Sequence, residues 1–209
     1  MAKTLEKPLS PGLRMTTQRL QALADGIFAI AMTLLVFGLK VPEGVSSTTD
    51  FNRHLLALWP QFWTFGQSFL LLGIFWVTSN RHVHFVGHTN QPYLWLNIVW
   101  LMFVALVPFS TSLLSRYAHY LTCALFFHLN LLLIGSFFYW NWRYAVNHGL
   151  VDPTLSSGAI RRIDKGNLIF PVASLCAVCL SFATPQWSNL AYLLILVSVR
   201  LVLKKSPKP

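Results

Sequence analysis

The strongest constraint on this chain is an apolar segment near its N-terminus that is long enough to cross a membrane. Residues 19–42 read RLQALADGIFAIAMTLLVFGLKVP, and from residue 24 to residue 39 only Asp25 and Thr33 are neither apolar nor glycine. A helix rises about 1.5 Å per residue, so a segment of this length matches the ~30 Å hydrocarbon core of a bilayer. We therefore expect a transmembrane helix here.

Asp25 is the unusual residue of this segment. A charge inside the bilayer costs roughly 3 kcal/mol even on scales derived from membrane insertion, so an embedded carboxylate is expected to have a partner and a role. The alternative is that Asp25 lies at the membrane interface and simply complements the N-terminal end of the helix dipole. The residue alone leaves both interpretations open.

The composition identifies an integral membrane protein. Hydrophobic residues make up 55% of the 209 residues and charged residues only 11%, whereas a soluble domain carries roughly 25% charged residues. At this length, membrane helices and short loops account for nearly the whole chain, so we expect a single membrane domain.

Five further apolar runs follow the first segment. They cover about residues 57–78, 93–114, 118–140, 167–183 and 187–203. Pro108 predicts a kink near the end of the third segment, because proline cannot donate a backbone hydrogen bond. We expect an all-α protein with six transmembrane helices over residues 18–203. Residues 1–17 form an N-terminal segment in this interpretation, residues 204–209 form a basic tail, and the loop 143–166 can hold a short interfacial helix.

The basic residues predict how these helices are oriented. With the N-terminus inside, thirteen of the sixteen Lys and Arg residues fall on the inner side, and three fall outside: Lys40, Arg53 and Arg116. Positive residues favour the cytoplasmic side, so we expect both termini to be cytoplasmic. The same distribution accounts for the net charge of +10 without a nucleic-acid partner.

The titratable residues do not suggest an enzyme. The chain has six acidic residues, of which only Asp25 lies within an apolar segment. Neither a nucleophile paired with a base nor a metal cluster can be assembled from the sequence. We therefore expect no catalytic residues, no cofactor and no resident metal.

Helical geometry places three bulky residues of the first segment on one stripe. At about 100° per residue, Ile30, Leu34 and Phe37 fall within about 60° of one another, and Thr33 lies about 60° from Ile30 to one side. Such a stripe can contact lipid, pack against another helix or line a pore. Arg19 and Asp25 lie on different faces of the helix, so each is expected to bond to a neighbouring helix or subunit.

The start of this segment resembles a known family motif. Residues 19–25 followed by GIFAIAMTLLV are similar to the first helix of the transmembrane-protein-175 potassium channel family, which opens with Arg, three variable residues and Phe-Ser-Asp. Arg19 and Asp25 match, while Leu23 and Ala24 replace the Phe and Ser. FWVTSNRHVHF in the second segment and NIVWLMFVALVPFSTSLL in the third also resemble the short prokaryotic members.

The resemblance implies a homotetramer in which the first helix of each subunit lines a central pore without a carbonyl selectivity filter. By position, Ile30, Leu34 and Phe37 would narrow that pore, and the hydroxyl of Thr33 would influence ion preference. The family motif further implies a structural network that includes Trp76 of the second helix together with Arg19, Leu23, Ala24 and Asp25.

The function implied by the resemblance is a modestly selective, potassium-permeable cation channel in the cell membrane of a bacterium or archaeon. Its partners would be further copies of the chain, potassium and other monovalent cations as permeant ions, and membrane lipid. The alternative is a proton-coupled secondary transporter in which Asp25 is the titrating group. A structural membrane protein without ion flux is the third interpretation.

Overall fold

The fold is a bundle of long helices. The computed structural model describes residues 17–42, 44, 46–192 and 195. Within these residues there is no strand, only an isolated antiparallel bridge between Val86 and Val151. The elements are α1 (Thr17–Leu34), η1 (Leu35–Gly38, a 3₁₀ helix), α2 (Thr48–Ala57), α3 (Trp59–Phe85), α4 (Gln91–Ala105), α5 (Val107–Arg116), α6 (Leu121–Asn147), α7 (Ser157–Asn167), α8 (Ile169–Ala183) and η2 (Pro185–Tyr192, also 3₁₀).

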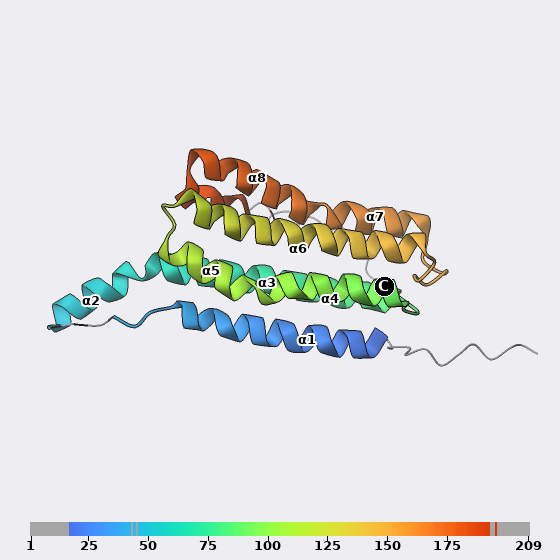
Figure 1. Cartoon of the computed structure of the whole chain (residues 1–209), viewed down its shortest axis with the longest axis horizontal. Helices are drawn as coiled ribbons and strands as arrows, with labels where there is room; N and C mark the ends of the chain where they lie inside the picture. Colours follow the sequence, from blue (N-terminus) through green and yellow to red (C-terminus); the bar gives the residue numbers. More distant parts are fainter. Residues whose placement is uncertain (1–16, 43, 45, 193–194, 196–209) are drawn as a thin grey trace, which may run out of the picture.

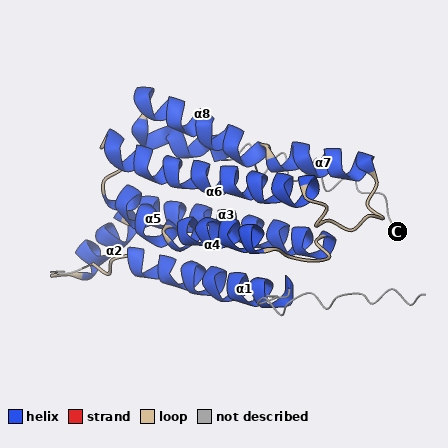
Figure 2. Ribbon diagram, turned by 45° about the vertical axis from the view of Figure 1, so that its right-hand side comes forward, coloured by secondary structure: helices blue, strands red, loops and turns tan. Residues whose placement is uncertain are grey.

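The long helices run side by side along one axis of the molecule (Figure 1). α1 lies at one edge of the bundle, α7 and α8 lie at the opposite edge, and α3 to α6 lie between them; the view in Figure 2 shows the same order. α1 packs against α3 and α4, whereas α6 packs against α4, α5 and α8. α2 projects from one end of the bundle, where it contacts α3.

Five helical segments of the described part of the chain are long and apolar enough to cross a membrane. They are Thr17–Gly38, Thr48–Phe85, Gln91–Arg116, Leu121–Asn147 and Ser157–Ala183. The predicted sixth helix, residues 187–203, falls largely outside the described residues, and its described beginning belongs to the 3₁₀ helix η2. The terminal segments 1–16 and 204–209 also lie outside the description, so their predicted locations stay predictions.

The third segment breaks into two helices close to Pro108, where the sequence predicts a kink. A turn at Leu106 separates α4 from α5, and Pro108 occupies the first turn of α5. Hydrogen bonds of α-helical spacing, from Leu106 to Met102 and from Ser110 to Leu106, still cross this turn. Proline lacks the N–H that an uninterrupted helix would direct at the carbonyl of Val104, and its ring crowds that carbonyl. The interruption therefore has a local covalent cause.

Two surface helices are bounded by serine caps. Ser47 accepts a hydrogen bond from the N–H of Asp50 at the start of α2 (3.2 Å), and Ser156 accepts one from the N–H of Ala159 at the start of α7 (3.3 Å). Such side chains satisfy N–H groups that the first helical turn leaves free. α7 is the short helix expected in the loop 143–166. α2 begins within the polar stretch between the first two apolar runs, where hydropathy marks no helix.

The core joins the two sides of the bundle through aromatic rings. Phe75 on α3 stacks on Phe170 of α8 with ring centroids 3.9 Å apart. Trp100 on α4 lies 5.6 Å from Phe28 of α1 and 5.4 Å from Phe138 of α6, again between ring centroids. Rings of this size dominate the energetics of a core. This cluster therefore fixes how α1 lies against the rest of the subunit.

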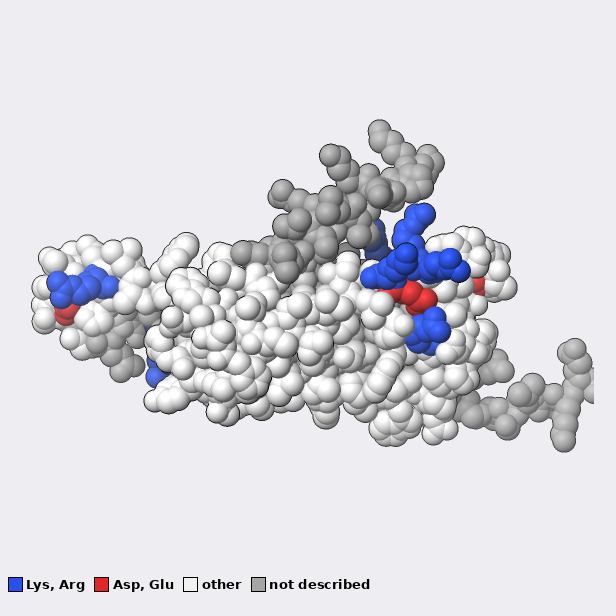
Figure 3. Space-filling model, turned by 90° about the horizontal axis from the view of Figure 1, so that it is seen from above, with Lys and Arg blue, Asp and Glu red and all other residues white. Residues whose placement is uncertain are grey.

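Charged residues gather at the two ends of the molecule. Figure 3 shows Lys and Arg at both ends of the visible face, with an uncharged band between them. Six described basic residues belong to the end that holds the start of α1 and α7, namely Arg19, Arg81, Arg143, Arg161, Arg162 and Lys165, and three belong to the other end, namely Lys40, Arg53 and Arg116. An uncharged band with charged ends is the pattern of a protein that crosses a bilayer.

Candidate functional site on α1

The first helix has one buried face and one exposed face within the subunit. Leu20, Ala24, Phe28, Ala31 and Leu35 are all buried against the neighbouring helices. On the opposite side, the exposed fraction of the residue is 60% for Ile30, 43% for Leu34 and 76% for Phe37. The stripe recognised in the sequence is therefore the face of α1 that no other described part of the subunit covers.

A change of helix type aligns the upper part of this stripe. Phe37 lies in η1, where the helix tightens from α to 3₁₀. In a 3₁₀ helix, side chains three positions apart eclipse each other, so Phe37 lies almost directly above Leu34. Four α-helical residues or three 3₁₀ residues each advance the chain by about 6 Å. Ile30, Leu34 and Phe37 thus form three apolar levels of about equal spacing.

Thr33 is exposed beside this stripe. Its hydroxyl lies 3.0 Å from the carbonyl oxygen of Ala29 and 2.9 Å from that of Ile30, and it donates to the backbone of its own helix. The donor is thereby used locally, whereas the hydroxyl oxygen keeps its lone pairs on the exposed side. Among residues 30–37 of the described first helix, Thr33 is the one whose side chain carries an oxygen.

Asp25 binds to a neighbouring helix of the same subunit. Its Oδ1 accepts a hydrogen bond of 2.7 Å from the indole Nε1–H of Trp76 on α3. One turn earlier on α1, Gln21 donates to Oδ1 of Asn80, one turn later on α3, over 3.3 Å. These four residues form a two-rung ladder between antiparallel helices. A bond to a carboxylate is about twice as strong as a neutral one, so the Asp25 rung contributes most.

The remaining motif residues lie in different surroundings. Arg19 and Leu23 are exposed on α1, whereas Ala24 is buried against the core. Arg19 forms no ion pair with another residue in the part of the chain that the structure describes. Of the five residues predicted to form a network, the structure therefore brings Asp25 and Trp76 into direct contact. The roles of Arg19 and Leu23 stay predictions.

Sequence reasoning did not place Gln21 and Asn80 in this ladder. A signal was present, because Gln21 lies one turn before Asp25 and Asn80 lies one turn after Trp76. Polar residues at this spacing share a helix face. What the sequence lacks is the register between α1 and α3, which depends on how the two helices pack into the core that contains Phe28 and Phe75.

A second polar cluster holds η2 against α6. The ring nitrogens of His128 lie 2.9 Å from the Tyr192 hydroxyl and 2.7 Å from the Ser188 hydroxyl, and Ser188 donates to the carbonyl of Pro185. Since Ser188 donates elsewhere, its oxygen accepts from Nε2–H of His128, and Nδ1 accepts from Tyr192. Both ring nitrogens of the buried His128 are therefore hydrogen bonded to η2.

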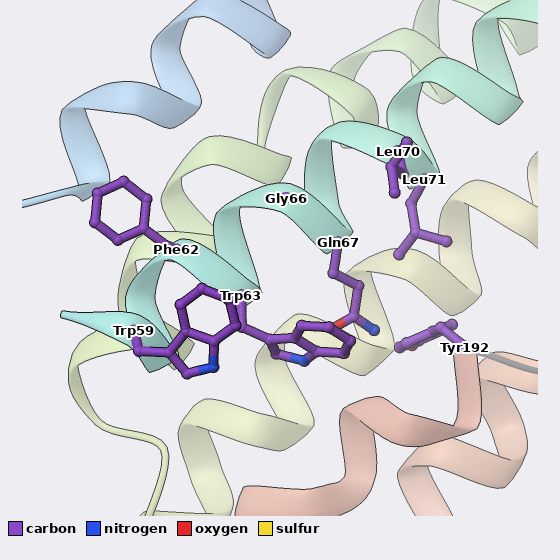
Figure 4. A pocket seen from close by; sticks show the side chains of 8 residues that line it. All are labelled: Trp59, Phe62, Trp63, Gly66, Gln67, Leu70, Leu71 and Tyr192. Carbon is purple, nitrogen blue, oxygen red and sulfur yellow. The ribbon is translucent and has the colours of Figure 1, made fainter. Parts of the chain in front are cut away.

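An apolar cavity of about 220 Å³ lies between α3 and η2. Figure 4 shows Trp59 and Trp63 on one side of it and Tyr192 on another, with Gln67 between Trp63 and Tyr192. Gln67 donates to the carbonyl of Asn189 over 2.7 Å. No residue of α1 lines this cavity. It is therefore separate from the exposed stripe of Ile30, Leu34 and Phe37.

Several known proteins are similar to this chain in sequence and in fold. The sequence profile of the family described as endosomal/lysosomal potassium channel TMEM175 matches residues 19–108. A potassium channel of Chamaesiphon minutus is 40% identical over 48% of this chain and 50% of its own length. A potassium channel of Streptomyces collinus is 31% identical over 74% of this chain and 79% of its own length. The chain thus spans half of the first relative and about four fifths of the second.

A solved structure agrees with these relatives. The crystal structure of a lysosomal potassium-selective channel TMEM175 homolog from Chamaesiphon minutus superposes with a TM-score of 0.78 at 30% identity, over 88% of this chain and 96% of that chain. The description of the family names an ion channel and no catalytic activity. Sequence identity, coverage and fold together lead to one conclusion: the chain belongs to the TMEM175 family.

Proposed function

We propose that the protein is a potassium-permeable cation channel, assembled from four copies whose α1 helices surround a central pore. The observation that carries the proposal is the exposed apolar stripe of Ile30, Leu34 and Phe37 on a helix whose opposite face is buried. The two bacterial relatives described above are named potassium channels, which favours a channel over a proton-coupled transporter centred on Asp25.

Three apolar levels provide a physical means of controlling ion passage. Four side chains that meet at one level leave a narrow apolar constriction, which excludes water and ions until it widens. An ion then passes with much of its hydration shell, so discrimination between potassium and sodium is modest. The Thr33 hydroxyl beside the constriction supplies an oxygen that contacts this shell and adjusts ion preference.

The proposal includes an orientation and a location. Both termini lie in the cytoplasm of a bacterium or archaeon, and the chain is a multi-pass protein of the cell membrane. The excess of basic residues at the end that holds α7 supports this orientation, since positively charged segments stay on the cytoplasmic side. The Asp25–Trp76 ladder holds α1 in place while its exposed face lines the pore.

Potassium flux from liposomes tests the proposal. The purified chain is reconstituted, and potassium and sodium release are compared for the wild type and for Ile30→Asn. We expect wild-type flux that favours potassium. In Ile30→Asn we expect faster flux or weaker preference for potassium, because an amide at the constriction retains water where isoleucine excludes it.

A matched variant separates the pore from a general effect of a polar residue in the membrane. Leu129→Asn also replaces an exposed aliphatic residue, but on α6. It should leave the flux and the ion preference unchanged. Equal effects of Ile30→Asn and Leu129→Asn would contradict the pore assignment. Transport that occurs only under a pH gradient would favour the transporter.

A further inference from the structure

We propose that the outer face of α7 and α8 is a binding site for one anionic phospholipid of the cytoplasmic leaflet. The site combines a cluster of exposed basic residues on α7 with an exposed apolar stripe on α8. It lies on different helices from the proposed pore, but its placement in the cytoplasmic leaflet and its exposure to lipid rest on the orientation and assembly proposed above.

α7 and α8 act as one continuous helix at this face. Leu168 separates them in the sequence, but its backbone has α-helical dihedral angles. The N–H of Leu168 bonds to the carbonyl of Asp164 over 3.3 Å, and the N–H of Val172 bonds to the carbonyl of Leu168 over 3.2 Å. Hydrogen bonds of α-helical spacing therefore cross the junction, and the positions of the side chains keep their register.

Because the helical register is continuous, one exposed stripe runs along α7 and α8, and it changes from basic to aliphatic residues along its length. Side chains at intervals of three and four residues are all exposed, beginning with two cations and continuing with aliphatic residues: Arg161, Lys165, Leu168, Val172 and Leu175. From Lys165 to Leu175 the helix rises about 15 Å, which is the depth of one leaflet of a ~30 Å hydrocarbon core. A headgroup at Lys165 would thus leave its acyl chains along Leu168, Val172 and Leu175.

The cations of this face are free to bind a phosphate. Asp164 is the acidic residue of α7, and Arg143 of α6 donates to its Oδ2 over 3.0 Å. This ion pair engages one oxygen of the carboxylate and ties α7 to α6. Arg161, Arg162 and Lys165 are exposed and form no ion pair within the described residues. Three unpaired cations attract an anionic headgroup.

The depth and the location of the cluster both suit a lipid. Figure 3 shows the basic residues at the border of the uncharged band, where headgroups meet hydrocarbon. Trp140, exposed on α6 one turn before Arg143, is of the residue type that occupies this interface. α7 and α8 form the edge of the bundle opposite α1 (Figure 1), so an assembly around α1 would leave this face toward the bilayer.

Native mass spectrometry of the purified chain in detergent tests the site. The protein is titrated with phosphatidylglycerol and with phosphatidylcholine of the same acyl chains. We expect tighter binding of phosphatidylglycerol. The triple variant Arg161→Gln, Arg162→Gln, Lys165→Gln should lose this preference, with an affinity about a hundredfold lower, since each basic residue near an anionic surface contributes about fivefold.

Matched variants distinguish the site from a general effect of charge. Lys40→Gln, Arg53→Gln and Arg116→Gln together remove the same charge from the other end of the subunit and should leave binding unchanged. Leu168→Ala with Val172→Ala retains every cation and should weaken phosphatidylglycerol binding several-fold. This second variant keeps the test valid should the triple variant fail to fold.

Four results would overturn the proposal. Equal binding of the two lipids would exclude recognition of the headgroup charge, and an equal loss in both triple variants would show a bulk effect of charge. Displacement of the lipid by an excess of glycerol 3-phosphate would identify a site for free phosphate. A changed number of subunits in the α7 variant would identify the face as a contact between copies of the chain.

Discussion

At the residue scale, the hydrogen bond between Asp25 and Trp76 explains how a carboxylate is accommodated in a membrane helix. Its Oδ1 receives the indole N–H at 2.7 Å, and the side chain lies on the side of α1 away from the exposed stripe. A carboxylate with a donor on the next helix serves to hold the two helices together. The Asp25 carboxylate thus helps to hold α1, which carries the exposed stripe of Ile30, Leu34 and Phe37, against α3.

We predict that Trp76→Phe destabilises the folded protein. The substitution retains most of the ring but removes the donor, and the loss is expected to be about 1–2 kcal/mol for a bond to a charged group that is partly exposed. Asp25→Asn keeps an acceptor oxygen and should lose less. The midpoint of thermal unfolding in detergent measures both effects.

Trp95→Phe is the control for this prediction. Trp95 is exposed on α4, and its indole makes no hydrogen bond to another helix among the residues that the structure describes. Its substitution should leave the midpoint unchanged. A Trp76→Phe protein as stable as Trp95→Phe would show that the ladder between α1 and α3 contributes nothing to the fold.

At the element scale, the sequence predicts the membrane helices because their apolar runs are long, but it does not predict how they end. α3 continues to Phe85 and α6 to Asn147, about seven residues past the predicted ends. These last turns are polar and lie beyond the apolar run, so hydropathy does not mark them. Bonds to other segments hold them, such as that from the N–H of Asp152 to the carbonyl of Phe85 at 2.8 Å.

Helical periodicity, and not the length of an apolar run, made the candidate stripe on α1 predictable. The angle between Ile30 and Leu34 depends only on helical periodicity, which the sequence contains. The alignment of Phe37 over Leu34 was not predictable, because the 3₁₀ turn of η1 forms where α1 packs against α5. The position of Phe37 over Leu34 therefore depends on tertiary contacts more than on local helix propensity.

Close packing of α6 against α8 predicts that a side chain at Gly135 destabilises the protein. A Cβ added at Gly135 would lie 3.0 Å from both Cδ and N of Pro171 and 3.2 Å from Cβ of Phe170. Backbone atoms cannot yield easily, so Gly135→Ala should destabilise the protein by about 1–3 kcal/mol, as overpacking does. Thermal unfolding in detergent provides the measurement.

Gly66→Ala on α3 is the matched control. A Cβ at Gly66 has nothing within 4 Å, and alanine is the better helix former by up to about 1 kcal/mol. This variant should be as stable as the wild type or more stable. If Gly135→Ala were equally well tolerated, α6 and α8 would be packed less closely than the structure describes.

At the scale of the whole molecule, the ends of the bundle differ in charge. The end with α7 carries twice as many described basic residues as the end with α2, and the positive-inside rule assigns it to the cytoplasm. In the proposed orientation α2 lies outside the cell. This orientation places the proposed lipid site in the inner leaflet and Phe37 nearest the outer mouth of the pore.

We predict that cysteines at the two ends react differently in intact bacterial cells. With the native Cys123, Cys176 and Cys179 replaced by alanine, Ser46→Cys before α2 should react with an impermeant maleimide. Ser157→Cys at the start of α7 should react only after the cells are permeabilised. The reverse pattern would invert the orientation and move the lipid site to the outer leaflet.

The central claim is that the exposed face of α1 lines the ion pathway, and cysteine accessibility during conduction tests it most directly. In the background without native cysteines, potassium current across a planar bilayer is recorded while a charged, water-soluble methanethiosulfonate reagent is added. We predict that Ile30→Cys and Phe37→Cys channels lose current, whereas Leu129→Cys channels do not, because that side chain faces lipid. Current that persists at positions 30 and 37, or falls equally at position 129, would contradict the account.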